Sequence, residues 1–422
     1  MGAEITLPLG LQSQLETLQQ ADLVVGIPSF NNVRTIPHVV RAVQVGLAKF
    51  FPGVRAVIVN SDGGSTDGTQ QAVQEASLEE YRPLLAAHPV YPIHRIVTPY
   101  HGIPGKGSAL RTVFQVAAAL NAKACAVVDS DLRSIEPAWM DLLLSPQLHE
   151  GFDFVAPLYL RHKYDGTITN SIVYPLTRSL YGRRVRQPIG GDFGFSGKLA
   201  RHYLEQDVWE SDVARFGIDA WMTTTAITDG FKVCQAFLGA KIHDAKDPAL
   251  DLSHMLRQVV GAVFGLMENR ETSWKAVQGS LPVPLFGMEH AVGLEPVRVD
   301  PDRMVSLFRT GQRELETIWH QILRPEVARD LKRLERGAPS DFRFPPDLWI
   351  RTLYDLAVAF HRRVMDHEHI LQALTPLYLG RIASFVRETE EASAEDVEVL
   401  QEQLCLRFEA MKPELIRLWD AP

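Results

Sequence analysis

The stretch Ala124-Cys125-Ala126-Val127-Val128-Asp129-Ser130-Asp131 decides the fold that we expect of this chain. Its apolar residues are typical of a strand buried in a parallel sheet. Residues i and i+2 of an extended chain point the same way, so Asp129 and Asp131 can converge at the carboxyl end of the strand, where open α/β sheets bind ligands. Two converging carboxylates repel each other unless a cation lies between them, which indicates a site for a hard divalent ion. A solvated turn is the alternative.

Strand-like and helix-like segments alternate through the first part of the chain. We expect strands at 23–27, 56–59, 95–97, 124–128, 152–157 and 231–238, and helices at 35–49, 70–76, 108–120, 172–181 and 218–228. Residues 183–194 are rich in Gly and Arg and are predicted to form a loop. This order predicts an α/β fold with a mostly parallel sheet and right-handed crossovers.

The character of the sequence changes after about residue 250. Amphipathic helical patterns dominate there, at 254–269, 303–324, 346–366, 368–390 and 394–419, with a Pro- and Gly-containing linker at 277–301. A chain of 422 residues exceeds one typical core. We therefore expect an N-terminal helix at 1–20, a sheet domain at 21–250 and a helical domain at 251–422. The helical part is either a homodimer interface or a lid.

Composition narrows the class of protein. The 46% hydrophobic and 22% charged residues are ordinary for a soluble globular protein, and the net charge of −8 argues against a general nucleic-acid partner. Cys125, Cys234 and Cys405 form no CxxC pair, which indicates buried thiols in a reducing, cytoplasmic compartment. We expect neither a signal peptide nor a transmembrane segment, since the sequence has no basic leader and no apolar run of ~20 residues.

Small or polar loops follow other expected strands. The loop Pro28-Ser29-Phe30-Asn31-Asn32 can meet a nucleoside with its side-chain amides, and Asp62-Gly63-Gly64-Ser65 offers a carboxylate with close backbone approach. Gly105-Lys106-Gly107 lacks the spacing of a P-loop, but Lys106 can contact an anion at a helix N-terminus. Taken alone, each is also explained by ordinary turn chemistry or by an exposed lysine.

The remaining candidates lie later in the sequence. If His243 reaches the acidic pair, the three side chains would form an open site of two oxygens and one nitrogen that substrate oxygens complete. Gln187-Pro188-Ile189-Gly190-Gly191-Asp192 is expected to edge a pocket. Asp192 and Asp219 can each orient a sugar hydroxyl or cap a helix. The basic residues suited to an acceptor's carboxylate or phosphate are Arg161, Lys163, Arg184 and Arg186.

Together these segments resemble the GT-A fold nucleotide-sugar glycosyltransferases over about residues 20–250. The resemblance is in particular to the retaining glucosyl-3-phosphoglycerate synthases and their mannosyl-3-phosphoglycerate and glucosylglycerate synthase relatives. Its markers, in chain order, are 28–32, 62–67, 105–110, 128–132, 187–192 and His243.

The resemblance implies a Rossmann-like sheet and a hexosyltransferase that uses a UDP- or GDP-hexose. It implies that Asp129, Asp131 and His243 bind the Mg²⁺ or Mn²⁺ ion that holds the diphosphate. It also implies that Asp219 positions the donor sugar and that Asp192 lines the sugar pocket. The residues that it places against the donor are Pro28, Phe30, Asn32, Asp62, Lys106, Ser130, Gly190 and Gly191.

The sequence departs from the family at three places. Many members have an acidic residue where Asn32 stands, and Asp192 replaces a longer glutamate. An arginine that helps bind the acceptor's phosphate is replaced near Thr167. Because of that replacement, plain glycerate stays as open an acceptor as 3-phosphoglycerate.

The expected reaction is metal-dependent transfer with retention of configuration, by a front-face route without a covalent glycosyl-enzyme. One alternative is an inverting family 2-type glycosyltransferase with Asp192 as general base. Another is a non-catalytic nucleotide-sugar sensor whose helical domain binds a partner. A nucleotidyltransferase would need a Gly-rich basic loop after the first strand, which 28–32 does not supply.

Overall fold

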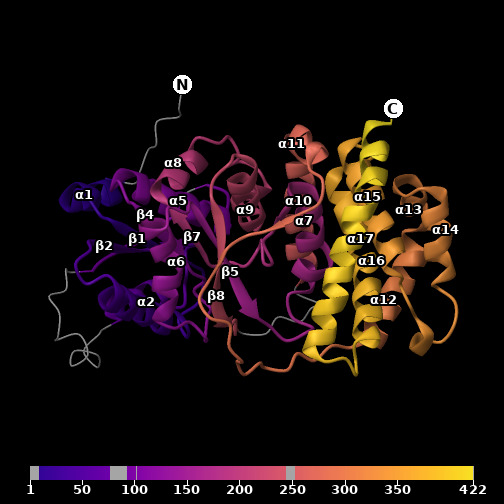
Figure 1. Cartoon of the computed structure of the whole chain (residues 1–422), viewed down its shortest axis with the longest axis horizontal. Coiled ribbons are helices and arrows are strands. Elements are labelled where there is room, and N and C mark those ends of the chain that lie inside the picture. Colours follow the sequence, from indigo (N-terminus) through magenta and orange to yellow (C-terminus); the bar gives the residue numbers. More distant parts are fainter. Residues whose placement is uncertain (1–8, 77–92, 101, 244–251, 422) are drawn as a thin grey trace. The chain divides into compact units, whose positions relative to one another are not determined.

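The structure is a computed structural model that describes residues 9–76, 93–100, 102–243 and 252–421. The chain divides into two compact units (Figure 1). The sheet unit comprises Met1–Leu160, Val185–Asp244 and Val283–Leu294, and the helical unit comprises Arg161–Arg184, Ala245–Pro282 and Glu295–Pro422. Neither unit is continuous in sequence, whereas we had expected one boundary near residue 250.

The sheet unit is built on a mostly parallel sheet of eight strands in the order β10-β8-β5-β7-β4-β1-β2-β3. Only β7 runs antiparallel to its neighbours, β4 and β5. The strands are β1 (Leu23–Ser29), β2 (Ala56–Asp62), β3 (His94–Pro99), β4 (Ala124–Val127), β5 (Phe154–Leu160), β7 (Phe193–Ser196), β8 (Val233–Ala240) and β10 (Leu285–Phe286). The predicted α/β class is therefore confirmed.

Helices cover both faces of this sheet. They are α1 (Leu9–Leu18), α2 (Ile36–Phe50), α3 (Thr69–Glu75), α5 (Lys106–Ala119), α6 (Ala138–His149), α8 (Gly197–Leu204) and α9 (Ile218–Thr228). Val25 and Ile27 of β1 share a buried cluster with residues of α2 and α6. Gly26 points the other way, toward α5, where an added Cβ would lie 2.6 Å from Val113. The alternation along β1 thus sets which helices cover which face.

Two expectations for this unit need correction. Residues 183–194 are not wholly loop, because they hold β6 (Arg183–Arg184) and the start of β7. Both strands are too short for a periodic pattern, and β7 is defined by its pairing with β4 and β5. Pro28 lies inside β1, paired with Ser61, rather than in the following loop.

The helical unit contains the helices that the amphipathic patterns predicted. Its elements are the π-helix η2 (Thr169–Val173), α7 (Tyr174–Tyr181), α10 (Leu252–Asn269), α11 (Glu271–Ala276), α12 (Pro301–Glu314), α13 (Glu316–Ile322), α14 (Pro325–Arg333), α15 (Pro346–His361), α16 (His367–Glu388) and α17 (Ala394–Asp420), with β9 (Leu281–Pro282) paired to β6. The single helix expected at 303–324 is divided into α12 and α13. Among the described helices, none is long and apolar enough to cross a membrane.

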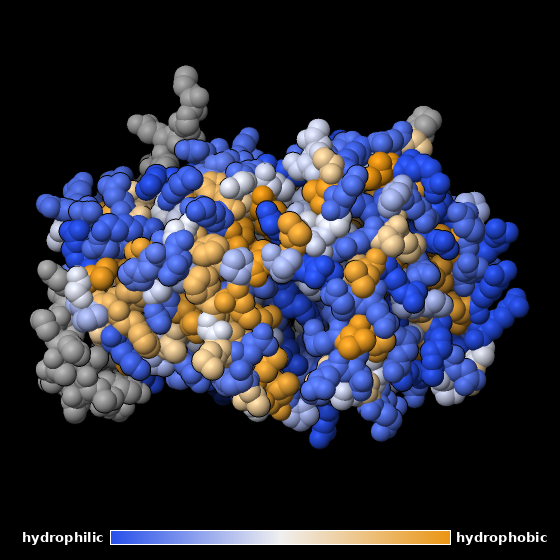
Figure 2. Space-filling view, viewed as in Figure 1, coloured by the Kyte–Doolittle hydropathy of each residue, from blue (hydrophilic) through white to orange (hydrophobic). Residues whose placement is uncertain are grey.

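The surface of the helical unit bears on the expected homodimer. On the face seen in Figure 2, its hydrophobic residues form small separate groups within a hydrophilic surface. The exposed apolar side chains of α17 include Val399 and Leu406. Singly scattered residues of this kind are normal on a monomer, so dimer formation stays a prediction.

A buried ion cluster joins α17 to α7 within the helical unit. The Arg178 side chain, which is fully buried, lies 2.5 Å from Glu402 Oε2 and 2.8 Å from Glu409 Oε1. It also donates a hydrogen bond to Ser280 Oγ at 3.0 Å. Burial opposes the charge of Arg178, but the hydrogen bonds that it donates to Glu402 and Tyr174 outweigh this effect and raise the pKa of the guanidinium. This cluster holds the C-terminal helix in place.

Replacing Arg178 with methionine is expected to lower the free energy of unfolding by roughly 2–3 kcal/mol, less than for a fully buried pair because Glu402 is half-exposed. Arg407→Met is the matched control, because Arg407 pairs with Asp347 in solvent and should contribute less than about 1 kcal/mol. Urea unfolding of both variants checks this, and equal losses would contradict it.

Candidate active site

The acidic pair lies at the carboxyl end of β4, as the sequence predicted. The strand ends at Val127, the Val128 amide donates to Gly26 O at 3.0 Å, and Asp129 follows directly. The loops after β1 and β2 leave the sheet at the same edge, because both strands run parallel to β4 and to each other.

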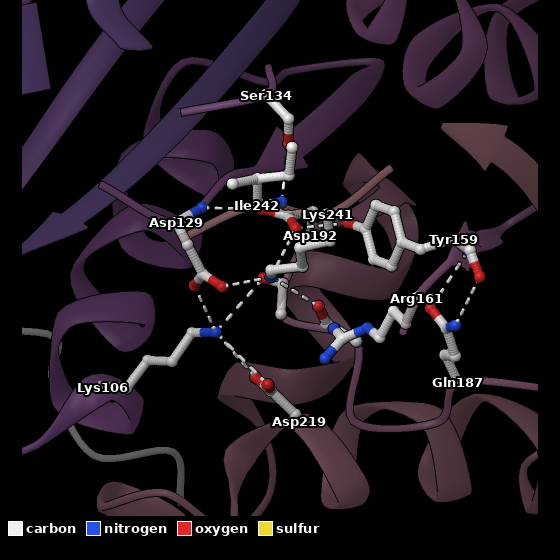
Figure 3. Close-up of polar contacts among 12 residues, drawn as sticks. Lys106, Asp129, Ser134, Tyr159, Arg161, Gln187, Asp192, Asp219, Lys241 and Ile242 are labelled. Carbon is white, nitrogen blue, oxygen red and sulfur yellow. Dashed lines mark hydrogen bonds and ion pairs between the residues drawn. The ribbon is translucent and has the colours of Figure 1, made fainter. Parts of the chain in front are cut away.

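The carboxylate of Asp129 lies between two lysine side chains (Figure 3). Lys106 Nζ is 2.8 Å from Asp129 Oδ1, and Lys241 Nζ is 2.7 Å from Oδ2. Lys106 is the first residue of α5, and Lys241 follows β8 directly. Burial alone would raise the pKa of Asp129, but the two ammonium groups hold it well below its usual range. Asp129 is therefore an ionised counter-charge for both lysines.

Asp192 is hydrogen-bonded to both Asp129 and Lys241 and is completely buried. Its Oδ1 accepts a hydrogen bond from the Asp129 amide at 2.7 Å. Its Oδ2 accepts from Lys241 Nζ at 2.8 Å and from the Tyr159 hydroxyl. Burial raises the pKa of Asp192 even though Lys241 opposes the rise. Both oxygens are engaged by protein donors, so the predicted contact of Asp192 with a sugar hydroxyl has no support in this geometry.

Asp219 comes from the first turn of α9 and faces Lys106. Both of its oxygens lie 3.2 Å from Lys106 Nζ, but only Oδ2 accepts a hydrogen bond. Oδ1 is buried and has no hydrogen-bond partner in the described parts of the chain. Burial raises the pKa of Asp219, and Lys106 opposes that rise. A buried carboxylate oxygen without a hydrogen bond calls for a hydrogen-bond donor, which a bound hydroxyl group could supply.

The glycine loop between β6 and β7 closes over the two lysines. Gly190 O accepts from Lys241 Nζ at 2.8 Å, and Gly191 O accepts from Lys106 Nζ at 3.2 Å. Gly191 has a φ of +90°, and a Cβ there would lie 2.2 Å from Asp129 Oδ2. The structure thus brings Gly191 against Asp129, where only glycine allows so close an approach, and Gly190 against Lys241.

The loop after β1 is tied to the acidic pair. Asn32 Oδ1 accepts hydrogen bonds from Ser130 Oγ at 2.8 Å and from the Phe30 amide at 3.0 Å. The Thr35 hydroxyl donates to Ser130 O at 2.7 Å. The residue Phe30 is 62% exposed. The structure therefore brings the predicted donor-binding residues Phe30, Asn32 and Ser130 together, with Phe30 exposed to solvent.

Asp62 shapes its own loop. Its Oδ1 accepts from the amides of Gly64 and Ser65 and from Gln70 Nε2, at 2.7–3.0 Å. Its Oδ2 accepts from the hydroxyls of Ser29 and Ser65, both at 2.7 Å. Burial would raise the pKa of Asp62, but these hydrogen bonds hold it below its usual value. The carboxylate is already well supplied with donors, so its contact with a nucleoside stays a prediction.

His243 lies beside the acidic pair through the backbone. It forms an isolated antiparallel bridge with Leu132, and the neighbouring Ile242 amide donates to Ser134 Oγ at 2.9 Å (Figure 3). Yet no three His, Cys, Asp or Glu side chains gather as a metal-binding group in the described part of the molecule. The predicted three-ligand metal site of Asp129, Asp131 and His243 therefore stays a prediction. Both oxygens of Asp129 lie against ammonium groups in this structure.

The basic residues predicted to bind the acceptor are divided between the two units. Arg161, Lys163 and Arg184 belong to the helical unit, whereas Arg186 belongs to the sheet unit. Arg161 lies 3.5 Å from Asp165, and Arg184 donates to Ser280 Oγ at 3.0 Å. Their role with an acceptor stays a prediction.

Lys163 has a structural role within the helical unit. Its Nζ donates to the carbonyl oxygens of Thr389, Glu390 and Ala392 at 2.7–3.0 Å. These carbonyls follow the end of α16, where the helix leaves acceptors without partners. An ammonium group used in this way has no hydrogen left for an acceptor molecule.

The sequence motifs did not predict that Lys241 and Tyr159 belong to the candidate site. A lysine just after a strand is usually a surface residue, and a tyrosine inside an apolar strand is usually core. The one available signal was position, since Lys241 stands two residues before His243 and follows a strand expected to end at the binding edge.

In comparisons with known proteins, this chain shows a limited similarity to solved structures. No family model matches the chain, and no curated protein matches it. Among solved structures, it is similar to glucosyl-3-phosphoglycerate synthase from Mycobacterium tuberculosis, which is of the family that the motifs resemble. The complex of that protein with Mn²⁺, UDP-glucose and phosphoglyceric acid is 19% identical, covers 63% of this chain and 85% of that chain, and has a TM-score of 0.42.

Two further complexes of the same synthase give similar values. The complex with phosphoglyceric acid is 20% identical, covers 62% of this chain and 85% of that chain, and has a TM-score of 0.43. The complex with Mg²⁺ and UDP is 19% identical, covers 64% and 85%, and has a TM-score of 0.42. We draw no functional conclusion from a likeness of this extent.

Proposed function

We propose that this chain is a cytoplasmic, metal-dependent retaining hexosyltransferase. It moves glucose or mannose from a UDP- or GDP-sugar to a hydroxyl of a small carboxylated acceptor, such as glycerate or 3-phosphoglycerate. The observation that carries the proposal is the cluster of Lys106, Asp129 and Asp219 under the glycine loop. These buried charged groups converge at the sheet edge where α/β proteins bind ligands.

Lys106 supplies positive charge where a diphosphate would lie. It opens α5, and the N-terminus of a helix of that length favours anions through the helix dipole. Its ammonium group is held by Asp129 and Asp219 and keeps a raised pKa despite its burial. A fixed cation in a site shielded from water stabilises charge that develops on a departing phosphate oxygen.

Asp219 fits a role in holding the donor sugar. Its Oδ2 accepts a hydrogen bond from Lys106, whereas Oδ1 has an ion-pair contact with Lys106 but no hydrogen bond, so Oδ1 can accept one from a sugar hydroxyl. A sugar hydroxyl that donates a hydrogen bond to this buried oxygen offsets the desolvation cost of the oxygen. This contact adds to specificity for a hydroxylated ligand.

Asp131 and His243 are the residues that would hold a divalent ion. Their segments are joined by the Leu132–His243 bridge, and the two side chains offer one carboxylate and one imidazole. Mg²⁺ and Mn²⁺ are commonly held by one or two protein ligands together with phosphate oxygens, so a two-residue site suits either ion once the diphosphate is present. Such an ion supplies Lewis-acid stabilisation of the leaving diphosphate.

Retention by a front-face route fits the state of the two inner carboxylates. Asp129 is held by two lysines, and Asp192 is sealed from solvent, so neither presents an oxygen to the anomeric carbon. The same burial of Asp192 disfavours the inverting alternative, in which it would be the general base. In the front-face route the departing phosphate oxygen takes the acceptor's proton.

The test is a panel of sugar nucleotides offered with glycerate or 3-phosphoglycerate, with and without EDTA, read by mass spectrometry. We expect one donor and one acceptor to give a hexosylated acid, and turnover to fall at least about 100-fold when the ion is removed. Anomeric NMR of the product should show the donor's configuration. The absence of any product with added Mg²⁺ or Mn²⁺ would overturn the proposal.

A further inference from the structure

Asp129, Asp192 and Lys241 form a closed ring of hydrogen bonds at the end of β4 (Figure 3). The Asp129 amide donates to Asp192 Oδ1 at 2.7 Å, and Lys241 Nζ donates to Asp192 Oδ2 at 2.8 Å. The ring is closed by the bond from Lys241 Nζ to Asp129 Oδ2 at 2.7 Å. The backbone amide of Asp129 is thus bonded to Asp192, its carboxylate is bonded to Lys241, and Asp192 and Lys241 are bonded to each other. We call this arrangement the aspartate–lysine ring.

The ring is supported from the strand β5. The Tyr159 hydroxyl donates to Asp192 Oδ2. The backbone of Tyr159 is fixed in turn by the Gln187 side chain, which accepts from the Tyr159 amide at 3.2 Å and donates to its carbonyl at 3.0 Å. Asp192, Tyr159 and Gln187 are all buried. Water therefore has little access, and each bond is stronger than it would be at the surface.

The two lysines on Asp129 are held differently. Lys241 Nζ meets three acceptors at 2.7–2.8 Å, and its side chain is 5% exposed. Lys106 Nζ meets Asp129 at 2.8 Å and its other acceptors only at 3.2 Å, and its side chain is 13% exposed. Lys106 is the cation that a ligand can reach, whereas Lys241 is enclosed by its acceptors.

We infer that Lys241 and Tyr159 are positioning residues of the active site, an inference that rests on the proposed function. Through the ring they fix the Asp129 carboxylate, so that its outer oxygen holds the Lys106 ammonium group where the diphosphate arrives. A buried lysine needs paired charges to offset its desolvation, and here those charges are the two carboxylates that define the site. Lys241 therefore holds the carboxylates of Asp129 and Asp192 close together in fixed positions, although their negative charges repel each other.

The test compares Lys241→Met with Lys123→Met. Lys123 precedes the same strand at its opposite end and forms an exposed ion pair with Asp22 at 3.0 Å, so it is a matched control. In Lys241→Met we expect kcat for sugar transfer to fall at least about tenfold, because a misplacement near 1 Å already costs about 100-fold. The KM for the donor should change less, since the nucleoside is expected to contact the loops after β1 and β2. Lys123→Met should behave like the wild type.

A double-mutant cycle separates positioning from a general structural role. Lys241→Met and Asp192→Asn break the same ring, so the double variant should lose no more kcat than the worse single variant. Losses that multiply would contradict the inference. So would a folded Lys241→Met with kcat within about twofold of the wild type, because a displaced Asp129 must cost more than that.

Tyr159→Phe covers the case in which Lys241→Met fails to fold. It removes one hydroxyl and keeps the ring packing against Trp139, whose centroid lies 5.6 Å away. We expect a drop in kcat of about threefold or more, with a fall in melting temperature no larger than the loss of one buried hydrogen bond brings. An unchanged kcat in this variant would overturn the inference.

Failure of the proposed function can be told apart from failure of the inference. A wild-type protein that transfers no sugar refutes the function alone. The ring is then judged from crystal structures of Lys241→Met and Tyr159→Phe. An Asp129 carboxylate that keeps its place on Lys106 in both would overturn it, and a displaced carboxylate would support it.

Discussion

Replacing Lys106 with methionine is expected to lower kcat for sugar transfer by roughly 10²–10³-fold, the usual cost of losing one fixed donor to developing negative charge. The methionine keeps the length of the side chain but removes the ammonium group that lies 2.8 Å from Asp129 and 3.2 Å from Asp219. Steady-state kinetics with the active donor checks this. Lys232→Met, at an exposed lysine of the same unit, should change kcat by less than about twofold.

Stability of the Lys106→Met variant should depend on pH in a defined direction. Burial raises the pKa of Asp219, and the loss of Lys106 removes the charge that opposes this rise. A carboxyl whose folded-state pKa lies above its unfolded value adds stability at low pH that is lost as pH rises through the folded pKa. The deficit in melting temperature should therefore be smaller near about pH 5 than near about pH 8. An equal deficit at the two pH values would show that Asp219 stays ionised and would contradict this expectation.

Replacing Gly191 with alanine is expected to lower kcat by about 100-fold, through displacement of the acidic pair. The added Cβ would lie 2.2 Å from Asp129 Oδ2 and 2.8 Å from Lys241 Nζ. Asp129 has no room to yield, since its backbone and carboxylate are both bonded to buried partners. The φ of +90° adds a strain of about 1–2 kcal/mol for any residue with a Cβ.

Gly230→Ala is the control that separates strain from collision. Gly230 has a φ of +80°, but a Cβ there would meet nothing within 4 Å. Its variant should lose about 1–2 kcal/mol of unfolding free energy and keep its kcat. Equal losses of kcat in the two variants would show that backbone strain, and not contact with Asp129, is the cause.

The local pattern of the sequence was enough to locate most of the sheet. Apolar runs bounded by polar loops predicted β1, β4 and β8 to within two residues at each end, and β2 to within three. The local pattern did not predict β7, because a segment as short as Phe193–Ser196 shows no hydrophobic periodicity. This strand is ordered by its pairing with β4 and β5. The local pattern also failed for the division into units, since residues 161–184 join the helical unit from within the expected sheet domain.

In the candidate site, the sequence predicted individual residues but not the contacts between them. Sequence motifs correctly placed Asp129 at a strand end and brought attention to Lys106, Gly191 and Asp219. They did not reveal that Asp129 is bonded to Lys241, which is 112 residues away in the chain. A lysine after a strand looks like a solvated residue until the facing carboxylates are known.

The sequence by itself determined that polar loops end neighbouring parallel strands, because strand periodicity and turn residues are local properties. The tertiary structure alone decided what each carboxylate is bonded to, and it places two lysines on Asp129 that the expected metal site did not include. Charge pairing depends on distances between segments far apart in the chain, and only the folded sheet fixes those distances.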